Sequence, residues 1–253
     1  MCYNNIGDSM IIIILTIVMT IMEMLGIPAS FFVNINFKDI NPIYFTLIVN
    51  FILAFILCFI LKKTLIKEWN FGLKKKGLLE GLKKYGLVGI FGSIIITISF
   101  IIGLPLNNKP TIYRLLIEGI IYYIGVAIME ELYLRGLLQN QLEKWFKKPL
   151  VAIILTSILF GIGHIFGSLG SPVLTIICKV IWNIGLGIYL GSIYYKTRNL
   201  WIPIIIHFIV NFMISIVYCF SISTSYPLIA LITSLVVFTI LGIFGIENIL
   251  KEE

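Results

Sequence analysis

Residues 87–105 read LVGIFGSIIITISFIIGLP, and none of these side chains carries a charge. A helix needs about 20 mainly apolar residues to cross a bilayer, so this stretch predicts a membrane-spanning helix. Similar apolar runs recur along the chain, and none shows the alternation typical of a membrane β-barrel. The sequence therefore predicts an all-α, polytopic membrane protein with about eight transmembrane helices, at 10–28, 42–61, 87–105, 113–138, 150–167, 173–195, 200–220 and 227–246.

The composition of the 253-residue chain agrees with this class. Hydrophobic residues make up 59% and charged residues 12%, and the mean hydropathy is +1.05. Soluble domains have about 45–50% apolar and about 25% charged residues, and a chain of this length has too little interior to hide the excess. A soluble enzyme, a coiled coil and a disordered chain are disfavoured. We expect residues 1–253 to form a single membrane domain.

The net charge of +7 indicates topology rather than a nucleic-acid partner. Most basic residues gather in loops that eight spans would place on one side of the membrane: Lys62–Lys84, Lys144–Lys148, and Lys196 with Arg198. The positive-inside rule then places both termini in the cytoplasm of a multi-pass cell-membrane protein. The lysines at 74–76 could also touch anionic lipid, although a role in topology alone is the simpler interpretation.

The first run and the cysteines carry little functional information. Residues 1–9 contain no Lys or Arg, and Pro28-Ala29-Ser30 is a poor cleavage site, so we interpret 10–28 as a span and not as a signal peptide. The cysteines form no CxxC pair or zinc-type cluster, which favours packing over disulfides: Cys2, Cys58, Cys178 and Cys219.

Ionisable side chains inside predicted spans are costly and indicate function by default. Residues 130–135 read EELYLR. Glu131 and Arg135 are four residues apart, so they share a helix face and can form an ion pair. Glu130 is turned by about 100° from Glu131, so we expect it to face elsewhere and to act as a general base.

Both histidines of the chain lie in predicted spans. His164 shares a helix face with Phe160. His207 shares a face with Asn211, and an imidazole N–H and an amide can donate to one oxyanion. Each histidine alone could be a structural interhelical hydrogen bond, worth about 0.6 kcal/mol on average. Combined with two glutamates, these groups favour hydrolysis by an activated water. No Ser–His or Cys–His pair stands at a spacing that suggests a covalent nucleophile.

Three motifs, Glu130-Glu131-x-x-x-Arg135, Phe160-x-x-x-His164 and His207-x-x-x-Asn211, resemble those of the CPBP family. This family of CAAX proteases and bacteriocin-processing enzymes, also called the Abi family, consists of intramembrane proteases. Gly187-x-x-x-Gly191, a spacing suited to close helix packing, and Leu200-Trp201-x-Pro203 are also similar to the family's pattern. The resemblance covers residues 112–215, which we expect to be the catalytic core, with additional spans and a basic cytoplasmic loop in 1–111.

The resemblance implies roles for the residues that match. Glu130 would activate water, and His164 would assist it and protonate the leaving amine. His207 and Asn211 would stabilise the oxyanion.

The same resemblance assigns Glu131 and Arg135 to an orienting pair, and we expect Phe160 to shape the pocket around the imidazole of His164. It implies a glutamate-type mechanism more than a metal-dependent one. If zinc were bound, Glu130, His164 and His207 would be its ligands.

These features predict an intramembrane endopeptidase that processes a peptide precursor or a membrane-protein tail. The alternative is a bacteriocin self-immunity membrane protein that acts by binding. A transporter with a proton path through Glu118, Glu130 and Lys179 is a third hypothesis, against which the absence of inverted repeats argues. The expected partners are the substrate and the lipid bilayer.

Depth in the membrane raises one difficulty. From the rise of a helix, His164 would lie about 20 Å and His207 about 10 Å from the cytoplasmic start of their spans. Helix tilt, a later start of the fifth span, or an extension of the fourth helix to Asn140 would reduce this difference. We further expect Arg114 to pair with Glu118, and Lys179 either to snorkel or to pair with Glu118 or Glu23.

Overall fold

The computed structural model describes residues 71–223 and 225–251, together with eight isolated positions before residue 71. Apart from those positions, the predicted spans at 10–28 and 42–61 lie outside the described residues, as does Glu23. The total of eight spans and the placement of the termini therefore stay predictions.

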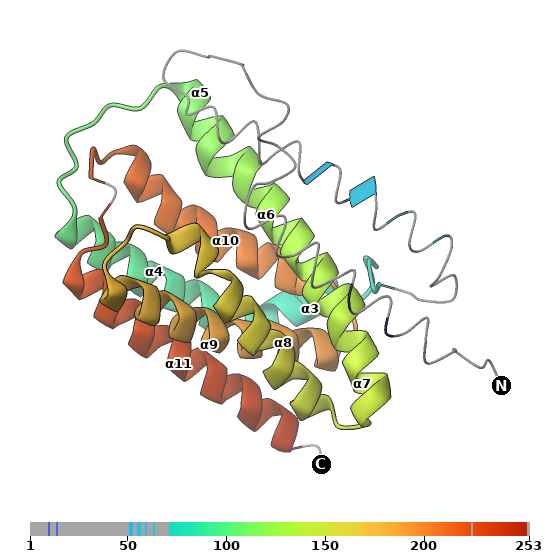
Figure 1. Ribbon diagram of the computed structural model, residues 1–253. Helices are drawn as coiled ribbons and strands as arrows, with labels where there is room; N and C mark the ends of the chain where they lie inside the picture. Colours follow the sequence, from blue (N-terminus) through green and yellow to red (C-terminus); the bar gives the residue numbers. More distant parts are fainter. Residues whose placement is uncertain are drawn as a thin grey trace.

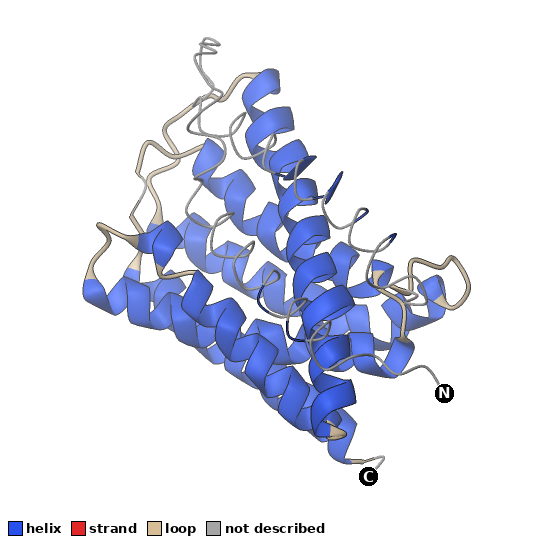
Figure 2. Ribbon diagram, turned by 45° about the vertical axis from the view of Figure 1, so that its right-hand side comes forward, coloured by secondary structure: helices blue, strands red, loops and turns tan. Residues whose placement is uncertain are grey.

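The secondary structure of the described residues is entirely helical. Six of its helices are long and apolar enough to cross a membrane: Leu78–Gly103, Ile112–Phe146, Pro149–Ser168, Val173–Thr197, Trp201–Cys219 and Leu228–Leu250. They coincide with the last six of the predicted runs. Figure 2 shows these helices joined by loops. The chain is thus a multi-pass membrane protein by length and composition.

The first described span begins earlier than predicted. It consists of α3 (Leu78–Gly81), η1 (Leu82–Gly86), which is a π-helix, and α4 (Leu87–Gly103). Gly77 precedes it in the left-handed conformation, with φ 75°. Lysines in the first two turns concealed this start from hydropathy, because charged side chains at a membrane boundary lower the local average without breaking a helix.

The fourth predicted span, 113–138, is also too short. The helical rod runs from Ile112 to Phe146, through α5 (Ile112–Arg114), η2 (Leu115–Ile121), α6 (Tyr122–Glu131), η3 (Leu132–Gln139) and α7 (Asn140–Phe146). Its polar last turns remain helical because Gln139 and Asn140 find hydrogen-bond partners in the bundle. The rod ends where Lys147 takes a left-handed conformation with φ 52°.

The fifth span covers Pro149–Ser168, in agreement with the predicted run at 150–167, but its α-helix ends before the span does. Helix α8 (Pro149–Gly163) begins with proline in its first turn and ends just before His164. A short 3₁₀ turn, η4 (Phe166–Ser168), follows. The Ser168 hydroxyl donates to the carbonyl of His164 at 2.7 Å, which satisfies one of the carbonyls left open at a helix end.

Helix α9 (Val173–Thr197) lies at the centre of the bundle and packs against α8 and α11 (Leu228–Leu250). Helix α10 (Trp201–Cys219) packs against α4 on one side and α6 on the other, as Figure 1 shows. A Cβ at Gly187 would lie 2.9 Å from the Cβ of Ser157, so α8 and α9 approach as closely as the predicted GxxxG spacing suggested.

Candidate active site

The predicted ion pair between Glu131 and Arg135 is present in the bundle interior. Arg135 Nη1 donates to Glu131 Oε1 at 2.9 Å, and the two side chains are 1% and 0% exposed. Arg135 Nη2 donates to the backbone carbonyl of Gly187 at 3.0 Å. Its guanidinium also lies over the Phe160 ring, with 5.2 Å from Cζ to the ring centroid. The arginine therefore joins η3 to both α8 and α9.

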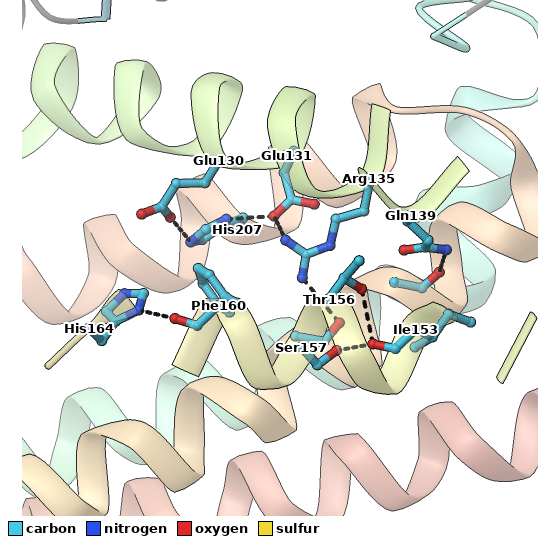
Figure 3. A network of polar contacts seen from close by, with 12 residues as sticks. Glu130, Glu131, Arg135, Gln139, Ile153, Thr156, Ser157, Phe160, His164 and His207 are labelled. Carbon is cyan, nitrogen blue, oxygen red and sulfur yellow. Dashed lines mark hydrogen bonds and ion pairs between the residues drawn. The ribbon is translucent and has the colours of Figure 1, made fainter. Parts of the chain in front are cut away.

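His207 reaches across from α10 and lies between the two adjacent glutamates. Its Nδ1 is 2.8 Å from Glu131 Oε1, and its Nε2 is 3.5 Å from Glu130 Oε2. Figure 3 shows both carboxylates directed from their helix towards this ring. An ionised carboxylate only accepts hydrogen bonds, so Nδ1 carries a hydrogen and donates it to Glu131.

This geometry corrects one expectation from the helix pattern. Glu130 and Glu131 do leave their helix in different directions, but Glu130 does not face a separate environment. The two nitrogens of one imidazole lie on different sides of the ring, so a single histidine meets both carboxylates. The Glu131 side chain is 0% exposed and that of Glu130 is 13% exposed, so Glu130 is the more accessible of the two.

Phe160 and His164 complete the cluster from α8. The Phe160 ring is fully buried and stands nearly perpendicular to both imidazoles, with ring centroids 4.7 Å from His164 and 5.7 Å from His207. His164 Nδ1 is 2.8 Å from the backbone carbonyl of Phe160. Because a carbonyl only accepts, Nδ1 must donate here, and Nε2 of the neutral ring is the acceptor.

The structure brings the predicted residues of three helices to one level. The difference in depth expected between His164 and His207 does not separate them, since Phe160 contacts both rings. The helical rod continues beyond residue 138 to Phe146, so Glu130 lies deeper within it than the predicted span implied. Such an extension was expected to reduce the difference in depth. Asn211 lies half-buried one turn after His207, and within residues 71–223 and 225–251 it forms no hydrogen bond to the cluster.

The zinc set named from the sequence is not assembled. Among the described residues, no three His, Cys, Asp or Glu side chains gather closely enough to hold a metal ion. Nδ1 of each histidine is engaged, by Glu131 for His207 and by the Phe160 carbonyl for His164. In this arrangement the described residues do not form a three-ligand set for zinc. Cys178 and Cys219 are buried and unpaired, in agreement with a packing role.

Gln139 belongs to the same network, although the sequence analysis did not include it. This fully buried side chain donates through Nε2 to the carbonyl of Gly191 at 3.0 Å, one turn beyond the bond from Arg135 to Gly187. The spacing of 131, 135 and 139 could have indicated it, because residues four apart line one helix face. The two bonds to glycine carbonyls set the position of η3 along α9.

Two further polar predictions have different outcomes. Arg114 Nε and Glu118 Oε2 form the expected ion pair at 2.9 Å. Lys179 does not pair with Glu118; its Nζ lies over the ring of Tyr226, 4.8 Å from the centroid.

Comparison with protein families matches residues 112–213 to the family described as type II CAAX prenyl endopeptidase Rce1-like. The matched segment contains all three motifs, from Glu130 to Asn211. A search of curated proteins found no significant match. The match confirms the family resemblance that the motifs carry.

Proposed function

Proceeding from this family relationship, which supports a CAAX-type intramembrane protease, we propose that the chain hydrolyses peptide bonds with a water activated beside Glu130. The observation that carries the proposal is the position of His207 between Glu130 and Glu131 inside the bundle. Buried ionisable groups are expensive in a membrane, and a purely structural role would need only the Glu131–Arg135 pair.

In the proposed reaction, Glu130 and Glu131 have different tasks. Glu131 is fully buried, and its Oε1 accepts hydrogen bonds from both Arg135 and His207. Glu131 therefore orients the imidazole. Glu130 is more accessible and lies next to His207 Nε2. Glu130 therefore takes the proton from water, while the hydroxide attacks the carbonyl carbon of the substrate.

The developing oxyanion requires hydrogen-bond donors. Because Nδ1 of His207 donates to Glu131, Nε2 becomes a donor when the ring is protonated. A protonated His207 and Arg135 would together carry two positive charges. These would balance the two negative charges of Glu130 and Glu131. Asn211, one turn along α10, would add its amide. Collapse of the tetrahedral intermediate breaks the C–N bond, and the proton passes to the leaving amine from Glu130 or through His164.

The expected substrate is a peptide precursor or a membrane-protein tail.

The basic residues of the described helices indicate their orientation in the membrane. Because successive spans cross in opposite directions, the basic ends of the six described helices lie on one side: the lysines at 74–76 and 83–84, those at 144–148, Lys196 with Arg198, and Lys251. The positive-inside rule places this side in the cytoplasm. We therefore assign the chain to the cell membrane with its basic loops inside.

The test compares wild type with Glu130→Gln, which keeps the shape of the side chain and removes its charge. Loss of a general base lowers the rate by about 10²–10⁴-fold. Membrane proteomics of cells that carry either form should show uncleaved precursors only with the variant, and the purified protein should cleave those precursors only as wild type.

Glu247→Gln is the matched control, because Glu247 is an exposed glutamate at the far end of α11. Thermal unfolding would show that both variants are folded. Full activity of purified Glu130→Gln would refute the mechanism, and an unchanged cellular phenotype would favour action by binding.

A further inference from the structure

Lys179 is a cation within the α9 span whose role the proposed reaction does not explain. The side chain is half-buried. Among the described residues no ion pair joins it to a carboxylate, and Glu118, one of the partners expected for it, pairs with Arg114. The Lys179 ammonium rests on the aromatic face of Tyr226. Such a contact covers the ammonium with an aromatic face but supplies no carboxylate to balance its charge.

Lys179 lies at the level of the candidate active site. A Cβ at Gly161 would be 2.6 Å from the carbonyl of Val180, so the last turn of α8 touches α9 next to Lys179. His164 follows Gly161 by three residues, so the turn of α9 that carries Lys179 packs against the end of α8 where His164 lies. The Asn183 amide bonds the carbonyl of Lys179 at 2.8 Å, one turn further along α9. Lys179 is therefore on a part of α9 that borders the His164 end of the candidate site.

We propose that Lys179 determines specificity by binding a carboxylate of the substrate peptide. The inference rests on the proposed peptidase function and names the chemistry of its substrate. The carboxylate is either the free C-terminus of the peptide or an acidic side chain near the scissile bond. A hydrogen bond to a charged group contributes about 1.5–3 kcal/mol, so we expect at least a tenfold preference for a peptide that carries this carboxylate.

The test measures binding separately from cleavage. The full chain with Glu130→Gln is placed in lipid nanodiscs, and three dansyl-labelled peptides of one apolar sequence are titrated by fluorescence anisotropy. The first ends in a free carboxylate, the second in an amide, and the third in an amide with one internal aspartate. The titrations are then repeated on chains that also carry Lys179→Gln, which removes the cation, or Lys179→Arg, which retains it.

The outcomes separate the sources of the carboxylate. Tighter binding of the first peptide identifies the C-terminus, and tighter binding of the third identifies an acidic side chain. In either case Lys179→Gln should reduce the preference to about onefold to twofold, less than 0.5 kcal/mol. Lys179→Arg should keep it, and Lys109→Gln, in an exposed loop, should leave it unchanged.

Equal binding of all three peptides would overturn the inference, as would a preference that persists in Lys179→Gln. Thermal unfolding of each variant identifies any that fails to fold, and Lys179→Arg then provides the comparison. A preference that depends on Lys179, in a chain that cleaves no peptide when Glu130 is intact, would leave the carboxylate site standing and refute the peptidase function instead.

Discussion

Arg135→Met would break a fully buried ion pair of the bundle interior. Methionine fills much of the same volume but cannot donate hydrogen bonds. The variant loses the bond to Glu131 at 2.9 Å, the bond to the Gly187 carbonyl at 3.0 Å, and the cation over the Phe160 ring. The Glu131 carboxylate, 0% exposed, then keeps His207 as its remaining partner.

The expected cost follows from the burial of the pair. Removing one partner of a buried ion pair destabilises a protein by about 3–5 kcal/mol, since the other charge remains without compensation. The carbonyl of Gly187 also accepts a hydrogen bond within its own helix. Loss of the bond from Arg135 to this carbonyl therefore adds little to the cost. For a chain of this size each kcal/mol lowers Tm by about 2–4 °C, and we expect a decrease of about 6–20 °C.

A double-mutant cycle tests the cause of this loss. Glu131→Gln together with Arg135→Met removes both charges, while the glutamine oxygen can still accept from His207 Nδ1. Because a neutral pair needs no compensation, the double variant should be more stable than either single variant. Lys251→Met removes an exposed pair with Glu247 and serves as the control, with little expected change.

The measurements are Tm by intrinsic fluorescence in detergent and the free energy of unfolding in SDS titrations. A decrease of less than 2 °C for Arg135→Met would refute the assignment of a buried, charge-compensating role to this arginine. Additive effects in the double variant would refute the coupling between the two side chains.

Two other predictions concern helix packing and use the same thermal assay. Gly187→Ala would place a Cβ 2.9 Å from that of Ser157 and should cost about 1–3 kcal/mol, while Gly167→Ala, which faces open space, should change Tm little; equal effects would contradict the close contact. Tyr189→Phe removes a hydroxyl that accepts from a backbone N–H of α4 and donates to a backbone carbonyl of η1, and should cost about 1–3 kcal/mol. Tyr113→Phe, at an exposed position, should be neutral, and a neutral Tyr189→Phe would show that the bridge contributes nothing.

The sequence predicted the elements that depend on local properties. Six apolar runs became six helices because the hydrophobicity of a segment alone decides whether it can lie in lipid. The Glu131–Arg135 pair was predictable because residues four apart meet on any helix. The polar turns at 139–146 were missed, since hydropathy does not register side chains whose hydrogen-bond partners lie on other helices.

What the sequence determined by itself is therefore the class of the protein, the order of its spans and the residue types of its candidate site. Only the tertiary structure decided that His207 lies between Glu130 and Glu131, and that Lys179 rests on the ring of Tyr226. Contacts between helices depend on their relative rotation and axial position. Here those are set by close approach at Gly187 and by hydrogen bonds to backbone carbonyls of α9, which no local pattern of hydrophobicity specifies.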